Sequence, residues 1–263
     1  MKLKSLLEYD KPEFSVSRRD VKDYKEIDDY VKAHGGKKLG SGVFAVVYDK
    51  SDAVQTVIKR GVTGFKDGRF GDGYLTFILE LMKDSRASDN HFLPQIFSVK
   101  IDCSNYVMGS TLCKYIVEME KLEAIEKFYD SKEFELDRVL SAINSDPQSH
   151  FSQVILMLSK LTNAKPESLI KYVVGKVKEA NDIDGDNRKV GLYEIWTVIE
   201  KLIHKMIINR PPGGIKITDK RLLEAIELLK KYQDRALDLH MENVMLRRSP
   251  YGLQLVISDP FGY

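Results

Sequence analysis

An aspartate and an asparagine late in the chain have the spacing that phosphoryl transfer requires. Asp238 and Asn243 lie in the segment Leu-Asp-Leu-His-Met-Glu-Asn-Val-Met-Leu, directly before an apolar stretch. In such a loop the aspartate accepts or orients the proton of an acceptor hydroxyl, and the asparagine supplies a metal ligand. Asp238 is therefore a candidate catalytic residue, and Asn243 is a candidate metal ligand.

A second candidate metal ligand follows the next apolar stretch. Asp259 comes directly after Val-Ile-Ser and precedes Pro-Phe-Gly. One short hairpin separates it from Asn243, so both oxygen donors are expected at one point, where they can chelate the Mg²⁺ that bridges nucleotide phosphates. Asp238 and Asn243 alone could simply cap a turn, but the position of Asp259 disfavours that alternative.

A glycine-rich turn early in the chain is suited to binding phosphates. Residues 40–47, Gly-Ser-Gly-Val-Phe-Ala-Val-Val, match G-x-G-x-x-G-x-V with alanine in the third glycine's place. Small residues let backbone N–H groups approach phosphates closely, and no helix opens directly after the turn, which excludes a Rossmann fingerprint. The candidate nucleotide-binding residues of this turn are Gly40, Ser41, Gly42, Phe44, Ala45 and Val47.

A lysine and a glutamate complete the candidate set. Lys59 follows Val57 and Ile58 at the end of a predicted strand, where its ammonium group can pair with phosphate oxygens. Glu80, on a predicted helix at 74–83, is the carboxylate expected to hold Lys59. Asp72 and Asp84 compete for that role at the ends of the helix, and Glu80 could instead be an ordinary surface residue.

The predicted elements that would position these side chains are mostly strands in the first half of the chain and mostly helices in the second half. Apolar periodicity predicts one helix within residues 1–35 and another at 74–83, with a loose glycine- and aspartate-rich stretch at 61–73. The predicted strands are 44–48, 54–59, 95–101, 115–119, 244–246 and 253–257. Further helices are predicted near 122–130, 134–144, 149–162, 166–179, 192–207 and 219–234.

Composition excludes several classes of protein. The chain has 263 residues, 43% of them hydrophobic and 30% charged, with a net charge of +2, so neither disorder nor a nucleic-acid-binding tail is indicated. No signal peptide or membrane-spanning run is evident. The only cysteines, Cys103 and Cys113, could pair but suit free thiols in a reducing compartment better. A cytoplasmic protein without membrane or nucleic-acid partners is expected.

Taken together, the motifs resemble those of the protein-kinase-like superfamily. The resemblance implies an α+β, two-lobed fold with a β-rich N-lobe and a mostly helical C-lobe that ends right after the metal-binding segment. It implies ATP and Mg²⁺ as cofactors, and a hinge between the lobes whose backbone holds adenine, at Glu118, Met119 and Glu120. The expected domains are an N-terminal helical extension at 1–35, an N-lobe at 36–121 and a C-lobe at 122–263.

Departures from the family pattern narrow the resemblance. Ala236 and Leu237 replace the usual His-Arg before the catalytic aspartate, and no activation segment is expected after the metal-binding segment that ends at Tyr263. The Asn-Val-Met-Leu-Arg continuation and the Asp-Pro ending are most similar to the compact early serine/threonine protein kinases of short-tailed bacteriophages. That similarity implies phosphorylation of serine or threonine in proteins of a bacterial host, within the host cytoplasm.

Two alternatives remain open at this point. The Asp-Leu-His of the catalytic loop also resembles the aminoglycoside and choline phosphotransferases, so the acceptor could be a small molecule. A pseudokinase that binds and inhibits a host protein is the non-enzymatic alternative. The intact Lys59, Asp238, Asn243 and Asp259 argue against lost catalysis.

Overall fold

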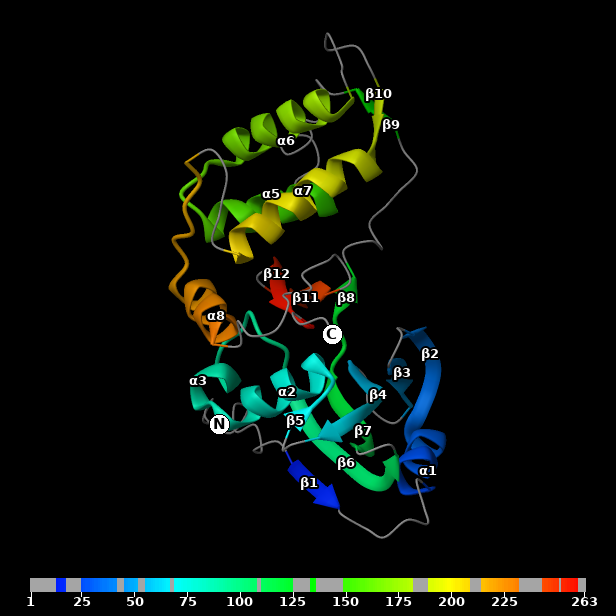
Figure 1. The fold of residues 1–263 in the computed structure, drawn as a ribbon. Coiled ribbons are helices and arrows are strands. Elements are labelled where there is room, and N and C mark those ends of the chain that lie inside the picture. Colours follow the sequence, from blue (N-terminus) through cyan, green and yellow to red (C-terminus); the bar gives the residue numbers. More distant parts are fainter. Residues whose placement is uncertain are drawn as a thin grey trace, which may run out of the picture. The chain divides into compact units, whose positions relative to one another are not determined.

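The chain forms two compact units in a computed structural model (Figure 1). The first unit is built from Met1–Asp89 and Pro94–Lys121, and the second from Asn90–Leu93 and Leu122–Pro260. The residues that the structure describes are 13–17, 25–41, 45–51, 55–66, 69–107, 110–124, 133–135, 149–181, 189–208, 214–231, 243–250 and 252–259.

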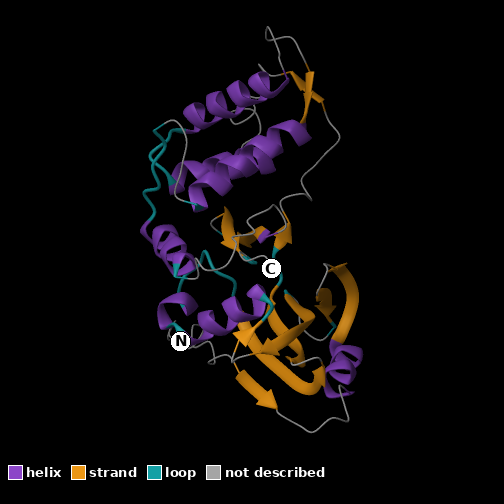
Figure 2. Ribbon diagram, in the orientation of Figure 1, coloured by secondary structure: helices purple, strands orange, loops and turns teal. Residues whose placement is uncertain are grey.

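A mostly antiparallel sheet dominates the first unit, drawn in orange in Figure 2. Its strands are β1 (Glu13–Ser17), β2 (Gly35–Ser41), β3 (Ala45–Lys50), β4 (Thr56–Lys66), β5 (Arg69–Phe70), β6 (Ile96–Val107) and β7 (Ser110–Glu120). The order across the sheet is β1-β6-β7-β4-β3-β2, and β5 pairs with the end of β4. Only β1 is parallel to its neighbour, β6.

Two helices cover opposite faces of this sheet because side chains alternate along each strand. Ile58 and Ile116 are fully buried on one face, where they pack with Ile27 of α1 (Lys25–His34). On the other face lies α2 (Gly73–Lys83), whose Tyr74 contacts the side chain of Lys59. A short helix, α3 (Ser85–Ser88), follows.

Helices form most of the described part of the second unit. They are α5 (His150–Leu161), α6 (Pro166–Asn181), α7 (Leu192–Ile207) and α8 (Lys220–Lys230). A small sheet in the order β12-β11-β8 contains β8 (Glu123–Ala124), β11 (Val244–Ser249) and β12 (Gly252–Ile257), and β12 packs against α5. A separate ladder joins β9 (Glu133–Glu135) to β10 (Lys189–Gly191).

The segment Asn90–Leu93 is built into the second unit although it precedes β6. The backbone N–H of Ile257 donates to the carbonyl of Phe92 at 2.8 Å. The guanidinium of Arg247 donates to the carbonyls of His91 and Leu93 at 2.6 and 3.1 Å. With Phe92 and Leu93 almost fully buried, this segment anchors the β11–β12 hairpin.

Several sequence predictions are confirmed. The fold is α+β, and helices were expected at the positions of α2, α5, α6, α7 and α8. The hairpin of β11 and β12 also lies where apolar stretches predicted strands. Among the described residues, no helix has both the length and the apolar character needed to cross a membrane.

Other predictions of secondary structure are wrong. Residues 123–124 and 134–135 lie in strands, where helices were predicted at 122–130 and 134–144. The rest of those two predicted helices, from 125 to 130 and from 136 to 144, lies outside the described residues. Strand β4 continues to Lys66 through the stretch predicted to be loose. Within residues 1–35, α1 is the predicted helix, but the strand at 13–17 was not predicted. In each missed strand the pairing partner lies elsewhere in the chain, and only the folded sheet reveals it.

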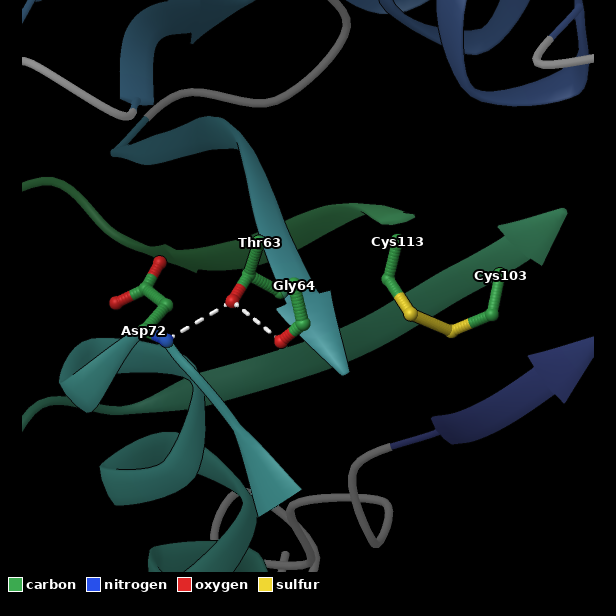
Figure 3. Close-up of a disulfide and its surroundings, with 5 residues drawn as sticks. All are labelled: Thr63, Gly64, Asp72, Cys103 and Cys113. Carbon is green, nitrogen blue, oxygen red and sulfur yellow. Dashed lines mark hydrogen bonds between the residues drawn. A yellow bond between two sulfur atoms is a disulfide. The ribbon is translucent and has the colours of Figure 1, made fainter. Parts of the chain in front are cut away.

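The expectation of two free thiols is also wrong. Cys103 and Cys113 form a disulfide between β6 and β7, which Figure 3 shows beside Thr63, Gly64 and Asp72. The antiparallel register sets these two cysteines directly opposite each other. Opposed residues of neighbouring strands lie close enough for their sulfur atoms to bond.

Candidate functional site

The glycine-rich turn joins two antiparallel strands, as expected. Gly40 pairs with Val47 and Ser41 pairs with Val46 in the β2–β3 ladder. A Cβ atom added at Gly40 would meet no described atom within 4 Å, so packing does not explain the glycine there. Ala45 and Val47 are half-buried in β3, whereas Gly42 and Phe44 lie outside the described residues.

Lys59 lies in the interior of the sheet and not at a strand end. Its neighbours across β4 are Val47 of β3 and Val117 of β7. The side chain points to the face that α2 covers, where its Nζ atom is 3.3 Å from the centroid of the Tyr74 ring. A cation at this distance from an aromatic face is attracted by the negative potential of the ring.

Helix α2 carries both Tyr74 and Glu80, so the helix that was predicted to hold Lys59 does contact it. The carboxylate of Glu80 forms an ion pair with Lys83 at 3.0 Å, and its side chain is about one-third exposed. A surface pair of this kind on a helix contributes little to stability. Tyr74, at the start of the same helix, contacts Lys59.

Asp72 caps α2 and is not a rival partner of Lys59. Its carboxylate accepts a hydrogen bond from the backbone N–H of Tyr74 at 2.8 Å and another from the hydroxyl of Tyr115. The N–H of Asp72 donates to the hydroxyl of Thr63 at 2.8 Å, and the Asp72 side chain is buried. Asp84, the other rival, ends α2 and caps α3.

The three predicted hinge residues continue strand β7. Glu118 accepts hydrogen bonds from Tyr30 and from Lys50, the latter at 3.2 Å, on the face covered by α1. Met119 accepts from the Tyr74 hydroxyl at 3.3 Å on the other face. Glu120 accepts from the backbone N–H of Gln95 at 2.8 Å.

The backbone at the end of β7 is likewise engaged. The N–H of Glu120 donates to Gln95 at 3.0 Å, and the N–H of Lys121 donates to Gln55 at 2.7 Å. These two donors are therefore used within the first unit. A backbone N–H of this segment that donates to a base would therefore lie beyond Lys121.

The second unit brings the two candidate metal ligands together. Asn243 directly precedes β11 and Asp259 follows β12 after one residue, at the open end of the hairpin. The carbonyl of Asn243 accepts from the N–H of Ser258 at 2.9 Å and from the N–H of Asp259 at 3.4 Å. The Ser258 hydroxyl donates to the same carbonyl at 3.1 Å. Asp238 lies outside the described residues.

The chemistry of this pair fits a hard cation. An amide oxygen and a carboxylate are ligands that Mg²⁺ accepts, and Mg²⁺ usually keeps waters or phosphate oxygens in its other positions. In the part of the chain that the structure describes, no group of three or more His, Cys, Asp or Glu side chains gathers into a metal site.

Sequence reasoning missed the roles of Tyr74 and Tyr115 near the start of α2. Tyr74 was read only as part of the predicted helix, because it shares the apolar face of Phe77, Ile78 and Leu81. Tyr115 was assigned only to a strand. The available signal was Asp72 directly before the helical pattern, since an aspartate in that position is a preferred N-cap.

Comparison with known proteins adds no assignment. No protein-family model matches the chain, and no curated protein matches it. The case for function therefore rests on the geometry of the two units and on the motifs of the sequence.

Proposed function

We propose that this chain is an ATP-dependent phosphotransferase with a two-lobed, protein-kinase-like fold. The observation that carries the proposal is the hairpin of β11 and β12, which brings Asn243 and Asp259 side by side. The catalytic-loop asparagine and the aspartate after the next strand are the two metal ligands of protein kinases. Their adjacency at one strand end supports the same use here.

The first unit supports the proposal through the order of its elements. A strand, a glycine-rich turn and a second strand come first, and Lys59 lies on the third strand when strands are counted from β2. Helix α2 follows and contacts Lys59. In protein kinases a glycine-rich loop precedes the phosphate-pairing lysine, which lies on the third strand, and a helix then positions that lysine.

The proposed reaction assigns a role to each candidate residue. The backbone of the Gly40–Ala45 turn covers the phosphates of ATP, and Lys59 pairs with them. Asn243 and Asp259 hold Mg²⁺, which neutralises charge on the phosphates when bound. Asp238 takes the proton of the acceptor hydroxyl, whose oxygen bonds to the γ-phosphorus as the bond to the bridging oxygen of ADP breaks.

Adenine recognition requires a revision of the expected hinge. Glu118–Glu120 were expected to supply backbone contacts, but the N–H groups of Glu120 and Lys121 already donate within the first unit. We assign the adenine contact to the backbone that follows Lys121. Catalysis in this scheme is mainly positioning and charge neutralisation.

The proposed acceptor is a serine or threonine of a protein, with host proteins as the substrate class if the chain comes from a bacteriophage. This part rests on the resemblance of the catalytic and metal segments to the phage kinases. A small-molecule acceptor and a binding-only role are the competing outcomes of the test below.

The test is transfer of labelled γ-phosphate from Mg-ATP into a bacterial lysate, with Asp238→Ala in parallel. Bands labelled by the wild type and absent with the variant support a protein kinase. Consumption of ATP without labelled protein favours a small-molecule acceptor. Binding of ATP with no turnover in any assay contradicts the enzymatic proposal and favours a pseudokinase.

A further inference from the structure

The phenol ring of Tyr74 lies against the ammonium group of Lys59 inside the first unit. Nζ is 3.3 Å from the ring centroid, well inside the roughly 6 Å range of cation–π attraction. Tyr74 is only 3% exposed, whereas Lys59 is half-buried. Burial penalises a charged amine, and an aromatic face offsets part of that penalty.

Several contacts fix the position of this ring. The backbone N–H of Tyr74 donates to the carboxylate of Asp72 at 2.8 Å, and Asp72 is itself bonded to Tyr115 and Thr63. At its other end, the Tyr74 hydroxyl donates to the sulfur of Met119 at 3.3 Å. A ring held at both ends offers a fixed surface to a long, flexible lysine.

The sheet leaves room for this arrangement because Gly61 has no side chain. A Cβ atom at Gly61 would overlap the ring of Tyr115. Tyr115 can therefore lie across β4 and reach the carboxylate of Asp72, which Figure 3 shows at the start of α2 beside Thr63. The ring centroids of Tyr115 and Tyr74 are 6.4 Å apart, so the two tyrosines pack together.

We propose that Tyr74 is a positioning residue for Lys59, whose ammonium group it holds in place for contact with nucleotide phosphates. Asp72, Tyr115 and Thr63 act one step further away, by fixing the start of α2. This role rests on the proposed function, since Lys59 pairs with phosphates only if the chain binds ATP. The contact between ring and ammonium does not depend on it.

The first experiment is a double-mutant cycle on ATP affinity. Tyr74→Leu removes the ring, and we expect it to weaken ATP binding about tenfold while adenosine binding is unchanged. In a Lys59→Met background the same substitution is expected to change ATP affinity less than twofold, because Tyr74 acts through Lys59. Tyr74→Phe keeps the ring, loses only the hydroxyl, and is expected to bind ATP like the wild type.

An equal loss of ATP affinity in both backgrounds, or none in either, would overturn the role of Tyr74. Absence of ATP binding by the folded wild type would instead contradict the proposed function. The second measurement separates these cases and needs no nucleotide. The Lys59 ε-methylene signal in an NMR spectrum, assigned with Lys59→Arg, is expected to be displaced by the ring current of Tyr74.

That displacement is expected to persist in Tyr74→Phe. Should Tyr74→Leu fail to fold, the wild-type and Tyr74→Phe spectra still decide the matter, because an ordinary lysine chemical shift in both would overturn the proposal. If the Lys59 signals of the wild type and of Tyr74→Phe are displaced but neither protein binds ATP, the contact between Tyr74 and Lys59 is confirmed and only the proposed function is contradicted.

Discussion

The two units hold their candidate site residues by different means. In the first unit, Lys59 projects from the middle of a strand and meets a helix that buried side chains fix in place, above all Asp72 and Tyr115. In the second unit, Asn243 and Asp259 lie at strand ends, and main-chain hydrogen bonds join them. We therefore expect the position of Lys59 to depend more on side chains elsewhere in its unit than the Asn243–Asp259 pair does.

The largest expected effect tests the second half of this comparison. Asp259→Asn keeps the shape of the side chain and every main-chain hydrogen bond of the hairpin but removes the charge. We expect phosphoryl transfer to fall about a thousandfold, with the free energy of unfolding changed by less than about 1 kcal/mol. The measurements are labelled-phosphate transfer and urea denaturation.

Gln254→Ala is the control on the same hairpin, since Gln254 contacts Arg247 at 3.3 Å away from the strand end. It is expected to leave transfer at the wild-type rate. If Asp259→Asn unfolds the second unit, main-chain bonds do not suffice to hold the pair.

The next largest effect concerns the cap of α2. Asp72→Ala removes the N-cap and leaves the buried Tyr115 hydroxyl without its carboxylate. We expect the first unit to lose about 3 kcal/mol, from about 1 kcal/mol for the cap and about 2 kcal/mol for the charged hydrogen bond. Hydrogen exchange followed on peptides from β7 and from α7 reports each unit separately.

Asp84→Ala is the matched control, because Asp84 caps α3 at the surface. We expect it to cost less than about 1 kcal/mol. If Asp72→Ala increased hydrogen exchange over the wild type more in α7 than in β7, Asp72 would not be a residue that stabilises the first unit.

Reduction of the disulfide is expected to have a comparable but smaller effect. Cys103 and Cys113 are separated by 10 positions, and closing such a loop stabilises a fold by about 2.5 kcal/mol on the chain-entropy model. Dithiothreitol should therefore increase exchange in β6 and β7 and leave the second unit unchanged, since the sequence has no other cysteine. Cys103→Ala with Cys113→Ala should no longer respond to reductant, and a wild type that also fails to respond would contradict the disulfide.

The smallest expected effect is a pH dependence at α1. Partial burial acts to raise the pKa of Asp28, but hydrogen bonds and charges from Lys114 and Arg60 outweigh it and hold that pKa below its ordinary value near 3.8. The distances are 2.8 Å to Lys114 and 2.6 Å to Arg60. Because the folded-state pKa is depressed, the stabilisation is complete above the ordinary pKa and is lost as pH falls below it.

The side chain of Asp28 is 35% exposed, so screening by solvent keeps this contribution below about 1 kcal/mol. As pH falls from about 5 to about 2, the wild type should lose free energy of unfolding as Asp28 becomes protonated. Asp28→Asn should reduce that loss by the same amount, as measured by denaturation at each pH. An equal loss of unfolding free energy in the wild type and in Asp28→Asn would show that the ion pairs of α1 do not contribute to stability.

The sequence was sufficient to predict those helices and turns that are determined by neighbouring residues. The 3.6-residue periodicity of α7 and its neighbours is written in consecutive residues, and the turn between β11 and β12 includes Gly252 at a φ of 108°, which glycine favours. Strands β1, β8 and β9 were missed because each depends on a partner far away in sequence. Periodicity carries no information about such pairings.

The candidate site residues also differ in how far their positions could be predicted from the sequence. Asn243 and Asp259 could be placed together because one short hairpin joins them, and the structure does bring them together. Lys59 was expected at the end of a strand, but it lies in the interior of β4, which continues to Lys66. Its contact with Tyr74 could not be predicted, since it depends on how α2 docks on the sheet through Asp72, Tyr115 and Gly61.

The most direct test of the central claim is calorimetric titration of ATP, with and without Mg²⁺, into the wild type, Lys59→Met and Asp259→Asn. We predict that Mg²⁺ tightens ATP binding to the wild type and to Lys59→Met but not to Asp259→Asn. We further predict that Lys59→Met loses most of the preference for ATP over adenosine. ATP binding by the wild type that is absent, or indifferent to Mg²⁺, would contradict the assignment of this chain as a phosphotransferase.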